Sequence, residues 1–195
     1  MTGFVRRVVT GHDENGKSIV ISDGLAPAVK TNPLRPDHRS SDIWKTHASP
    51  VPIFAAEVDP TLGPRTIHPP PHGTVIRIAE ITPESEEIRN LTPEQAREFF
   101  KGSGNEAAST YERGGRHPMM HRTETIDYAV ILDGEITLLL DDEDVELKTG
   151  DVVIQRGINH AWSNRSGKLV RILYVLIDGR FAPELTALFK TGSGH

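Results

Sequence analysis

The hydrophobic pattern divides the chain into a polar N-terminal half and a C-terminal half of short apolar segments. From residue 117 onward these segments alternate with turn residues, and most are too short to be ordinary helices. Short strands at this spacing are typical of antiparallel sandwiches and barrels. We predict strands at residues 117–123, 127–132, 135–140, 145–147, 151–156, 161–164 and 169–178.

The N-terminal half contains fewer strand signals. Residues 4–10 and 18–22 are rich in Val and Ile, and the Asn15-Gly16 pair between them is a strong hairpin signal. A further strand is predicted at residues 73–80. Residues 23–50 are rich in Pro, Asp and Ser, with Trp44 as their largest apolar anchor, so we expect an ordered loop or arm there.

Two short helices are also expected. Thr92 can cap a helix that has proline in its first turn and Gln95 at the capping-box position. This helix should end near Lys101, with Gly102 as a left-handed stop. A second helix is predicted at residues 183–190, followed by a frayed tail in which His195 has no expected role.

Composition excludes several classes of protein. The 195 residues include no cysteine, which rules out disulfides, thiolate zinc sites and thiol nucleophiles and fits a reducing compartment. A formal charge of −5 argues against a nucleic-acid partner. The longest apolar stretch, residues 172–177, is too short to cross a bilayer. We therefore expect a soluble, cytoplasmic protein with no membrane or nucleic-acid partner.

Three side chains form the leading candidate site. His121 precedes a tight turn that returns the chain to Asp127, and His160 follows Gly157, where a strand can bend at a barrel wall. The geometry permits all three to meet inside a barrel. Two imidazoles and one carboxylate are a suitable ligand set for a divalent metal ion with open coordination positions.

Alternative roles stay open for several residues. Glu124 could replace Asp127 as the carboxylate ligand, and His117 could act as an acid–base group near neutral pH. Either Arg77 or Arg171 could clamp a substrate carboxylate if it points inward. The remaining substrate-binding candidates are the aromatic residues Tyr128 and Trp162.

The segments around His121 and His160 resemble the two motifs of the cupin superfamily. The first motif is matched by Gly115, His121 and Gly134, and the second by Gly150, Gly157, His160 and Asn164. The likeness is tight over residues 115–178. Within the superfamily, these segments resemble a subgroup of small single-domain cupins. It implies a jelly-roll β-barrel but does not specify an activity, because cupins include oxygenases, decarboxylases, isomerases and non-enzymatic binders.

The sequence also departs from the family pattern. Thr123 replaces the second histidine of the first motif, and Asp127 stands in place of the glutamate. In the second motif, Gln155 occupies a position where proline is common, and the opening gap is one residue shorter. The remaining two-histidine, one-carboxylate set is the face found in non-haem Fe(II) oxygenases.

These observations lead to one reading of the whole chain. We expect an all-β, cupin-type jelly-roll barrel with an N-terminal strand arm and a few short helices. Its parts are an N-terminal hairpin and extended arm (1–60), a barrel entry strand with a short helix (61–114), the cupin barrel core (115–180), and a C-terminal helix and tail (181–195).

The functional expectation is a metal-dependent enzyme acting on a small organic acid or phenolic substrate, by dioxygenase-like or by decarboxylase- or isomerase-like chemistry. One divalent ion (Fe, Zn, Mn or Ni) would be held by His121, Asp127 and His160. The alternatives are a non-catalytic cupin that binds a small ligand or metal, and a barrel without metal. We also expect a homodimer formed through the N-terminal strands, because exposed strand edges tend to pair.

Overall fold

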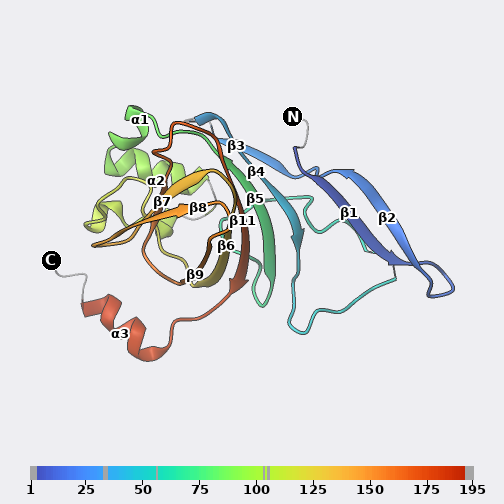
Figure 1. Ribbon diagram of the computed structural model, residues 1–195. Helices are drawn as coiled ribbons and strands as arrows, with labels where there is room; N and C mark the ends of the chain where they lie inside the picture. Colours follow the sequence, from blue (N-terminus) through green and yellow to red (C-terminus); the bar gives the residue numbers. More distant parts are fainter. Residues whose placement is uncertain (1–3, 33–34, 56, 103, 105, 192–195) are drawn as a thin grey trace.

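The computed structural model describes residues 4–32, 35–55, 57–102, 104 and 106–191. Two antiparallel sheets face each other and form the predicted all-β jelly-roll barrel (Figure 1). The larger sheet has six strands in the order β3 (Val29–Asn32), β4 (Arg35–Lys45), β5 (Thr74–Ile81), β11 (Val170–Asp178), β6 (Thr125–Asp133) and β9 (Val152–Arg156). The smaller sheet has the order β10 (Ala161–Ser163), β7 (Glu135–Leu139) and β8 (Asp144–Lys148).

The hydrophobic core lies between the two sheets. Strand β6 shows why: its side chains at 125, 127, 129 and 131 are buried, whereas those at 126, 128 and 132 are exposed. This period of two places one row of β6 inside the barrel. The buried cluster consists of Ala79, Ile81, Ala129, Ile131, Ile136, Val170 and Ile172.

The prediction of a loop at residues 23–50 is wrong, because β3 and the eleven-residue β4 lie there. The sequence of β4 is polar since one of its inward positions carries charge. Asp42 is fully buried and pairs in register with Arg77 of β5. Burial alone raises the pKa of Asp42, but Arg77, Arg65 and Lys45 outweigh this and hold the pKa below its ordinary value. At this position of β4, ion pairs therefore take the place of the apolar side chain by which a strand is usually recognised in a sequence.

A second wrong prediction concerns the strand at residues 117–123. This segment is a turn with the Met120 amide bonded to the His117 carbonyl at 2.9 Å, and only isolated bridges form at His121. Pro118 has no amide hydrogen to give to a ladder, so an ordinary central strand is disfavoured here.

The helices largely follow the sequence signals. Helix α2 (Pro93–Gly102) begins with the predicted capping box: the Thr92 amide donates to Gln95 Oε1 at 2.9 Å, and the Gln95 amide donates to Thr92 Oγ1 at 3.3 Å. It continues through Gly102 instead of stopping before it. Helix α3 (Pro183–Thr191) confirms the second prediction. Among the described residues, the helical elements that the sequence did not predict are the short α1 (Glu86–Arg89) and two 3₁₀ turns at Glu106–Ala108 and Tyr111–Arg113. The tail containing His195 lies outside the described residues.

The predicted hairpin pairs β1 (Arg6–His12) with β2 (Ser18–Leu25) as a separate two-stranded sheet. It projects from the molecule on the side away from α1 and α2 (Figure 1). Ring and ion contacts hold its base: Arg7 lies 5.9 Å from the Trp44 ring and pairs with Asp59 at 2.5 Å. Beyond this base the hairpin is largely exposed to solvent, and every residue of β2 is exposed.

Candidate functional site

Two of the three predicted ligands lie side by side. His121 and His160 form a backbone bridge, with each amide donating to the other carbonyl at 2.9 and 3.0 Å. Paired residues of an antiparallel bridge point to the same side. The two imidazole rings accordingly have centroids 4.4 Å apart. Backbone pairing thus brings together two side chains that are 39 positions apart in sequence.

Each imidazole is held in one orientation by the backbone. His121 Nδ1 lies 3.0 Å from the Met119 carbonyl oxygen, and His160 Nδ1 lies 3.1 Å from that of Ile158. A carbonyl oxygen only accepts, so Nδ1 carries the hydrogen and Nε2 keeps its lone pair. Metal-binding histidines in proteins are commonly oriented in this way.

The electrostatics keep both rings neutral. Burial lowers the pKa of His121, and the Met119 carbonyl offsets this only in part. Burial lowers the pKa of His160 to about 3, with a further contribution from a charge on His121. Neutral imidazoles are the form that binds a metal ion, because a protonated ring has no free lone pair.

Asp127 lies on the inward row of β6 and is only 5 % exposed. Among the described residues its Oδ1 has no hydrogen-bond partner. Burial raises its pKa to about 6, although the Thr125 hydroxyl and the charge of Arg77 act in the opposite direction. The carboxyl group therefore titrates close to neutrality, as groups at functional sites often do.

The residues fit a metal ion only in part. The imidazole pair has suitable chemistry and orientation, but no three His, Asp or Glu side chains gather into one metal-holding group within the described parts of the chain. The structure thus joins His121 to His160 without bringing Asp127 into the same group. Thr123, at the position of the missing histidine, is buried with its hydroxyl 2.8 Å from that of Thr125.

Gln155 is a polar residue of the interior that sequence reasoning treated only as a departure from a motif. It pairs in register with Asp127 across β9 and β6 and is 1 % exposed. Among the described residues neither its Oε1 nor its Nε2 has a hydrogen-bond partner. Its shared parity with Val153, which packs on the core, was the signal that could have identified it.

Aromatic side chains form one wall of this interior. The ring centroid of Trp162 lies 6.4 Å from that of His160 and 5.7 Å from that of Tyr174. Burial raises the pKa of the Tyr174 phenol, and the charge of Asp127 raises it further. Sequence analysis proposed Trp162 but missed Tyr174, although Tyr174 shares its parity with the apolar positions 170, 172 and 176.

The remaining substrate-binding candidates have other surroundings. Arg77 shares the inward row of β5, but its guanidinium donates to Asp42 at 2.7 Å and to the carbonyls of residues 66 and 67. Tyr128 is 40 % exposed on the outward row of β6, and Arg171 lies 3.5 Å from Glu80 on the outward row of β11. The interior site therefore does not include Tyr128 or Arg171.

The acid–base candidate His117 and the alternative carboxylate ligand Glu124 also lie in different places. His117 is buried with its Nε2 3.0 Å from a Glu84 oxygen, and the other Glu84 oxygen accepts from Ser163 at 2.8 Å. Glu124 is exposed, and its carboxylate accepts from the Phe181 amide at 3.0 Å. Glu124 thus holds the chain before α3 instead of facing the histidine pair.

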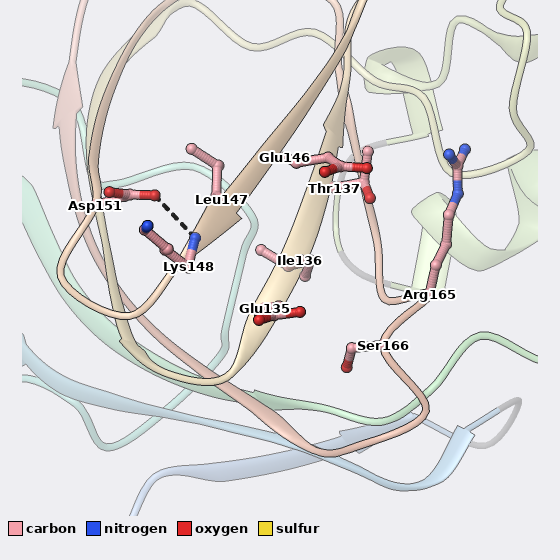
Figure 2. Close-up of a pocket in the computed structure, with 9 residues that line it drawn as sticks. All are labelled: Glu135, Ile136, Thr137, Glu146, Leu147, Lys148, Asp151, Arg165 and Ser166. Atoms are coloured by element: carbon pink, nitrogen blue, oxygen red, sulfur yellow. Dashed lines mark hydrogen bonds between the residues drawn. The ribbon is translucent and has the colours of Figure 1, made fainter.

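A cavity of about 440 Å³ lies elsewhere, on β7, β8 and the turns beside them (Figure 2). It is lined by Glu135, Ile136, Thr137, Glu146, Leu147, Lys148, Asp151, Arg165 and Ser166. Its polar groups already have partners in several cases: the Lys148 amide donates to Asp151 at 2.9 Å, and Arg165 donates to Asp144 at 2.8 Å. None of the predicted site residues lines it, so we place the candidate site in the barrel interior.

Comparison with known proteins agrees with the motifs. The cupin domain model matches residues 108–176. Phomopsin biosynthesis cluster protein C' of Diaporthe leptostromiformis is 32 % identical over 195 residues, covering 93 % of this chain and 86 % of that protein. The cupin-domain-containing oxidoreductase fogC of Aspergillus ruber is 25 % identical over an alignment that covers 89 % of this chain and 72 % of that protein. Among solved structures, the Schizosaccharomyces pombe Cnp3 cupin domain is 12 % identical with a TM-score of 0.42. The match covers 95 % of this chain and 93 % of that chain.

Within the described residues, no helix has both the length and the apolar character needed to cross a bilayer.

Proposed function

Because this chain belongs to the cupin family, we propose that it is a metal-dependent enzyme that carries out redox chemistry on a small organic acid or phenolic compound. The observation that carries the proposal is the pair of neutral imidazoles, with His160 buried and His121 half-buried, each with Nδ1 bound to a carbonyl and Nε2 available. The names of similar proteins support it, since several are cupin-domain-containing oxidoreductases and others belong to biosynthesis clusters.

We assign the metal to the Nε2 atoms of His121 and His160. The Asp127 carboxylate would complete the ligand set only if its side chain moved toward them, because the described residues do not gather the three into one group. When bound, a divalent ion with open coordination positions supplies Lewis acidity and, in the case of iron, redox chemistry. The chain supplies the surroundings. Carbonyl groups fix the imidazole orientation, and the rings of Trp162 and Tyr174 offer a planar substrate an apolar wall that excludes water.

The test is metal content and turnover in His160→Ala. Removing one of two adjacent imidazoles should abolish metal binding and lower turnover by more than the roughly 10–100-fold typical of changes outside the ligand shell. Metal is measured by elemental analysis of protein purified without chelator, and turnover by substrate-dependent oxygen uptake.

His12→Ala is the matched control, because His12 is exposed on β1. It should retain both metal and turnover. Metal at wild-type stoichiometry in His160→Ala would overturn the ligand assignment.

A second candidate is a non-catalytic cupin that binds a small ligand. The observation that favours it is the pair of buried polar side chains, Asp127 and Gln155, whose free atoms suit ligand binding without any metal. Saturable ligand binding with no metal content and no oxygen uptake would select this alternative.

A further inference from the structure

We propose that Gln155 determines the substrate specificity of the barrel interior, by binding the polar edge of a planar ring compound that carries a carbonyl group beside a hydroxyl group. This inference uses the same site as the proposed function. It goes further by naming a residue outside the ligand set and the substrate chemistry that this residue recognises.

The side-chain amide of Gln155 is buried and, among the described residues, unpaired. Gln155 is 1 % exposed, and neither of its polar atoms has a partner within the described structure. Buried polar groups in native proteins are nearly always hydrogen-bonded, because leaving them unpaired costs free energy. A fold that keeps such an amide without a partner departs from the usual rule, and such departures concentrate at functional sites.

The Gln155 side chain lies on the inward face of its strand. Gln155 shares its face of β9 with Val153, which packs against the core, whereas Ile154 on the other face is 54 % exposed. Its register partner Asp127 shares the inward row of β6 with Ala129 and Ile131. The two side chains are therefore neighbours on the inner surface of the barrel, where Asp127 also has a free Oδ1.

The unpaired atoms define which ligand groups they can bind. The amide nitrogen of Gln155 requires an acceptor, while its carbonyl oxygen and the Asp127 oxygen require donors. A ligand with a carbonyl oxygen beside a hydroxyl group meets both needs. The rings of Trp162 and Tyr174 favour attachment of these groups to a planar ring.

The experiment compares Gln155→Met with the wild type in two measurements. The first is thermal unfolding of the ligand-free protein. Methionine has a similar shape without the unpaired polar atoms, so the melting temperature should rise by about 2–6 °C.

The second measurement is binding of three probes by tryptophan fluorescence: salicylamide, phenol and benzamide. Salicylamide carries both polar groups, and each of the other two lacks one. The wild type should bind salicylamide most tightly. Gln155→Met should weaken salicylamide about 10- to 100-fold, the effect of leaving a buried polar group of the ligand unpaired, while changing phenol less than about 3-fold.

Ile154→Met is the matched control, since it places the same side chain one position away on the exposed face of β9. It should bind all three probes as the wild type does. Weaker salicylamide binding by Gln155→Met, with an unchanged or higher melting temperature, supports the inference. Wild-type affinity in Gln155→Met, or a fall of several degrees in its melting temperature, overturns it.

These outcomes are separable from those of the proposed function. If the protein holds no metal and takes up no oxygen, the enzyme proposal fails. Selective binding of salicylamide that depends on Gln155 would still stand.

Discussion

At the scale of single residues, the interior is shaped by polar groups that are buried without full compensation. Asp127 is the clearest case. Burial raises its pKa from 3.8 to about 6, although the Thr125 hydrogen bond and the Arg77 charge lower it. Between these two pH values the folded protein holds a proton that the unfolded chain has already lost. The free energy of unfolding contributed by this group therefore decreases as the pH rises through that window.

We expect Asp127→Asn to remove this pH dependence from the metal-free protein. Two pKa units correspond to about 3 kcal/mol, so the variant should gain about that much stability relative to the wild type between pH 4 and pH 7. Urea unfolding at both pH values, with chelator present, measures the difference.

Asp142→Asn is the control for this experiment, because Asp142 is exposed in the turn before β8. It should follow the wild type at both pH values. Parallel pH profiles for Asp127→Asn and the wild type would contradict the raised pKa.

At the scale of elements, the turn after β9 joins the site to the C-terminal helix. Gly157 has φ of +60°, and a Cβ atom there would lie 2.4 Å from a ring carbon of Phe181. The Phe181 ring in turn packs against Phe189 of α3, with centroids 4.9 Å apart. The bend that leads to His160 thus depends on a position with neither room nor suitable backbone geometry for another residue.

We expect Gly157→Ala to destabilise the protein by about 2–4 kcal/mol. The positive φ accounts for about 1–2 kcal/mol of this, and displacement of the Phe181 ring adds the rest. Chemical denaturation measures the loss.

Gly150→Ala separates the two contributions, because Gly150 has φ of +94° but no atom within 4 Å of the added Cβ. It should lose only the part due to backbone strain. Equal losses in the two variants would show that the Phe181 contact has no effect.

At the scale of the whole molecule, the hairpin β1–β2 is the element with the least internal support. A two-stranded sheet is marginally stable alone. This one exposes five large apolar side chains: Val8, Ile19, Val20, Ile21 and Leu25. We therefore maintain the proposal of a homodimer formed through these strands, in which a second copy covers the exposed apolar rows.

Light scattering should give twice the chain mass of 21.5 kDa for the wild type. The double substitution Val20→Lys with Ile21→Lys should give the mass of one chain, because burying two ammonium groups in the contact is unfavourable. Ser18→Lys adds charge to an exposed polar position of the same strand and should remain dimeric. A wild-type mass near 21.5 kDa would refute the dimer.

The local parts of the structure could be predicted because their causes are local. The hairpin follows from the Asn15-Gly16 pair and the start of α2 from Thr92 and Gln95, since turn chemistry and capping involve residues a few positions apart. The barrel strands after residue 124 followed in the same way from alternation and turns. The sequence also singled out His121, Asp127 and His160 as one set, and of these the structure places the rings of the two histidines together.

The remaining features depend on neighbours that are distant in sequence. β4 is a strand because Arg77 and Arg65 neutralise its buried Asp42, a compensation that no local pattern displays. Gln155 and Tyr174 join the interior because register and parity turn them inward, across from Asp127 and Trp162. The sequence by itself thus determined the all-β class through periodicity and turns, and the likeness to the cupin motifs singled out His121 and His160. Only the tertiary structure decided which polar groups are buried without partners, because burial and pairing are properties of the packed chain.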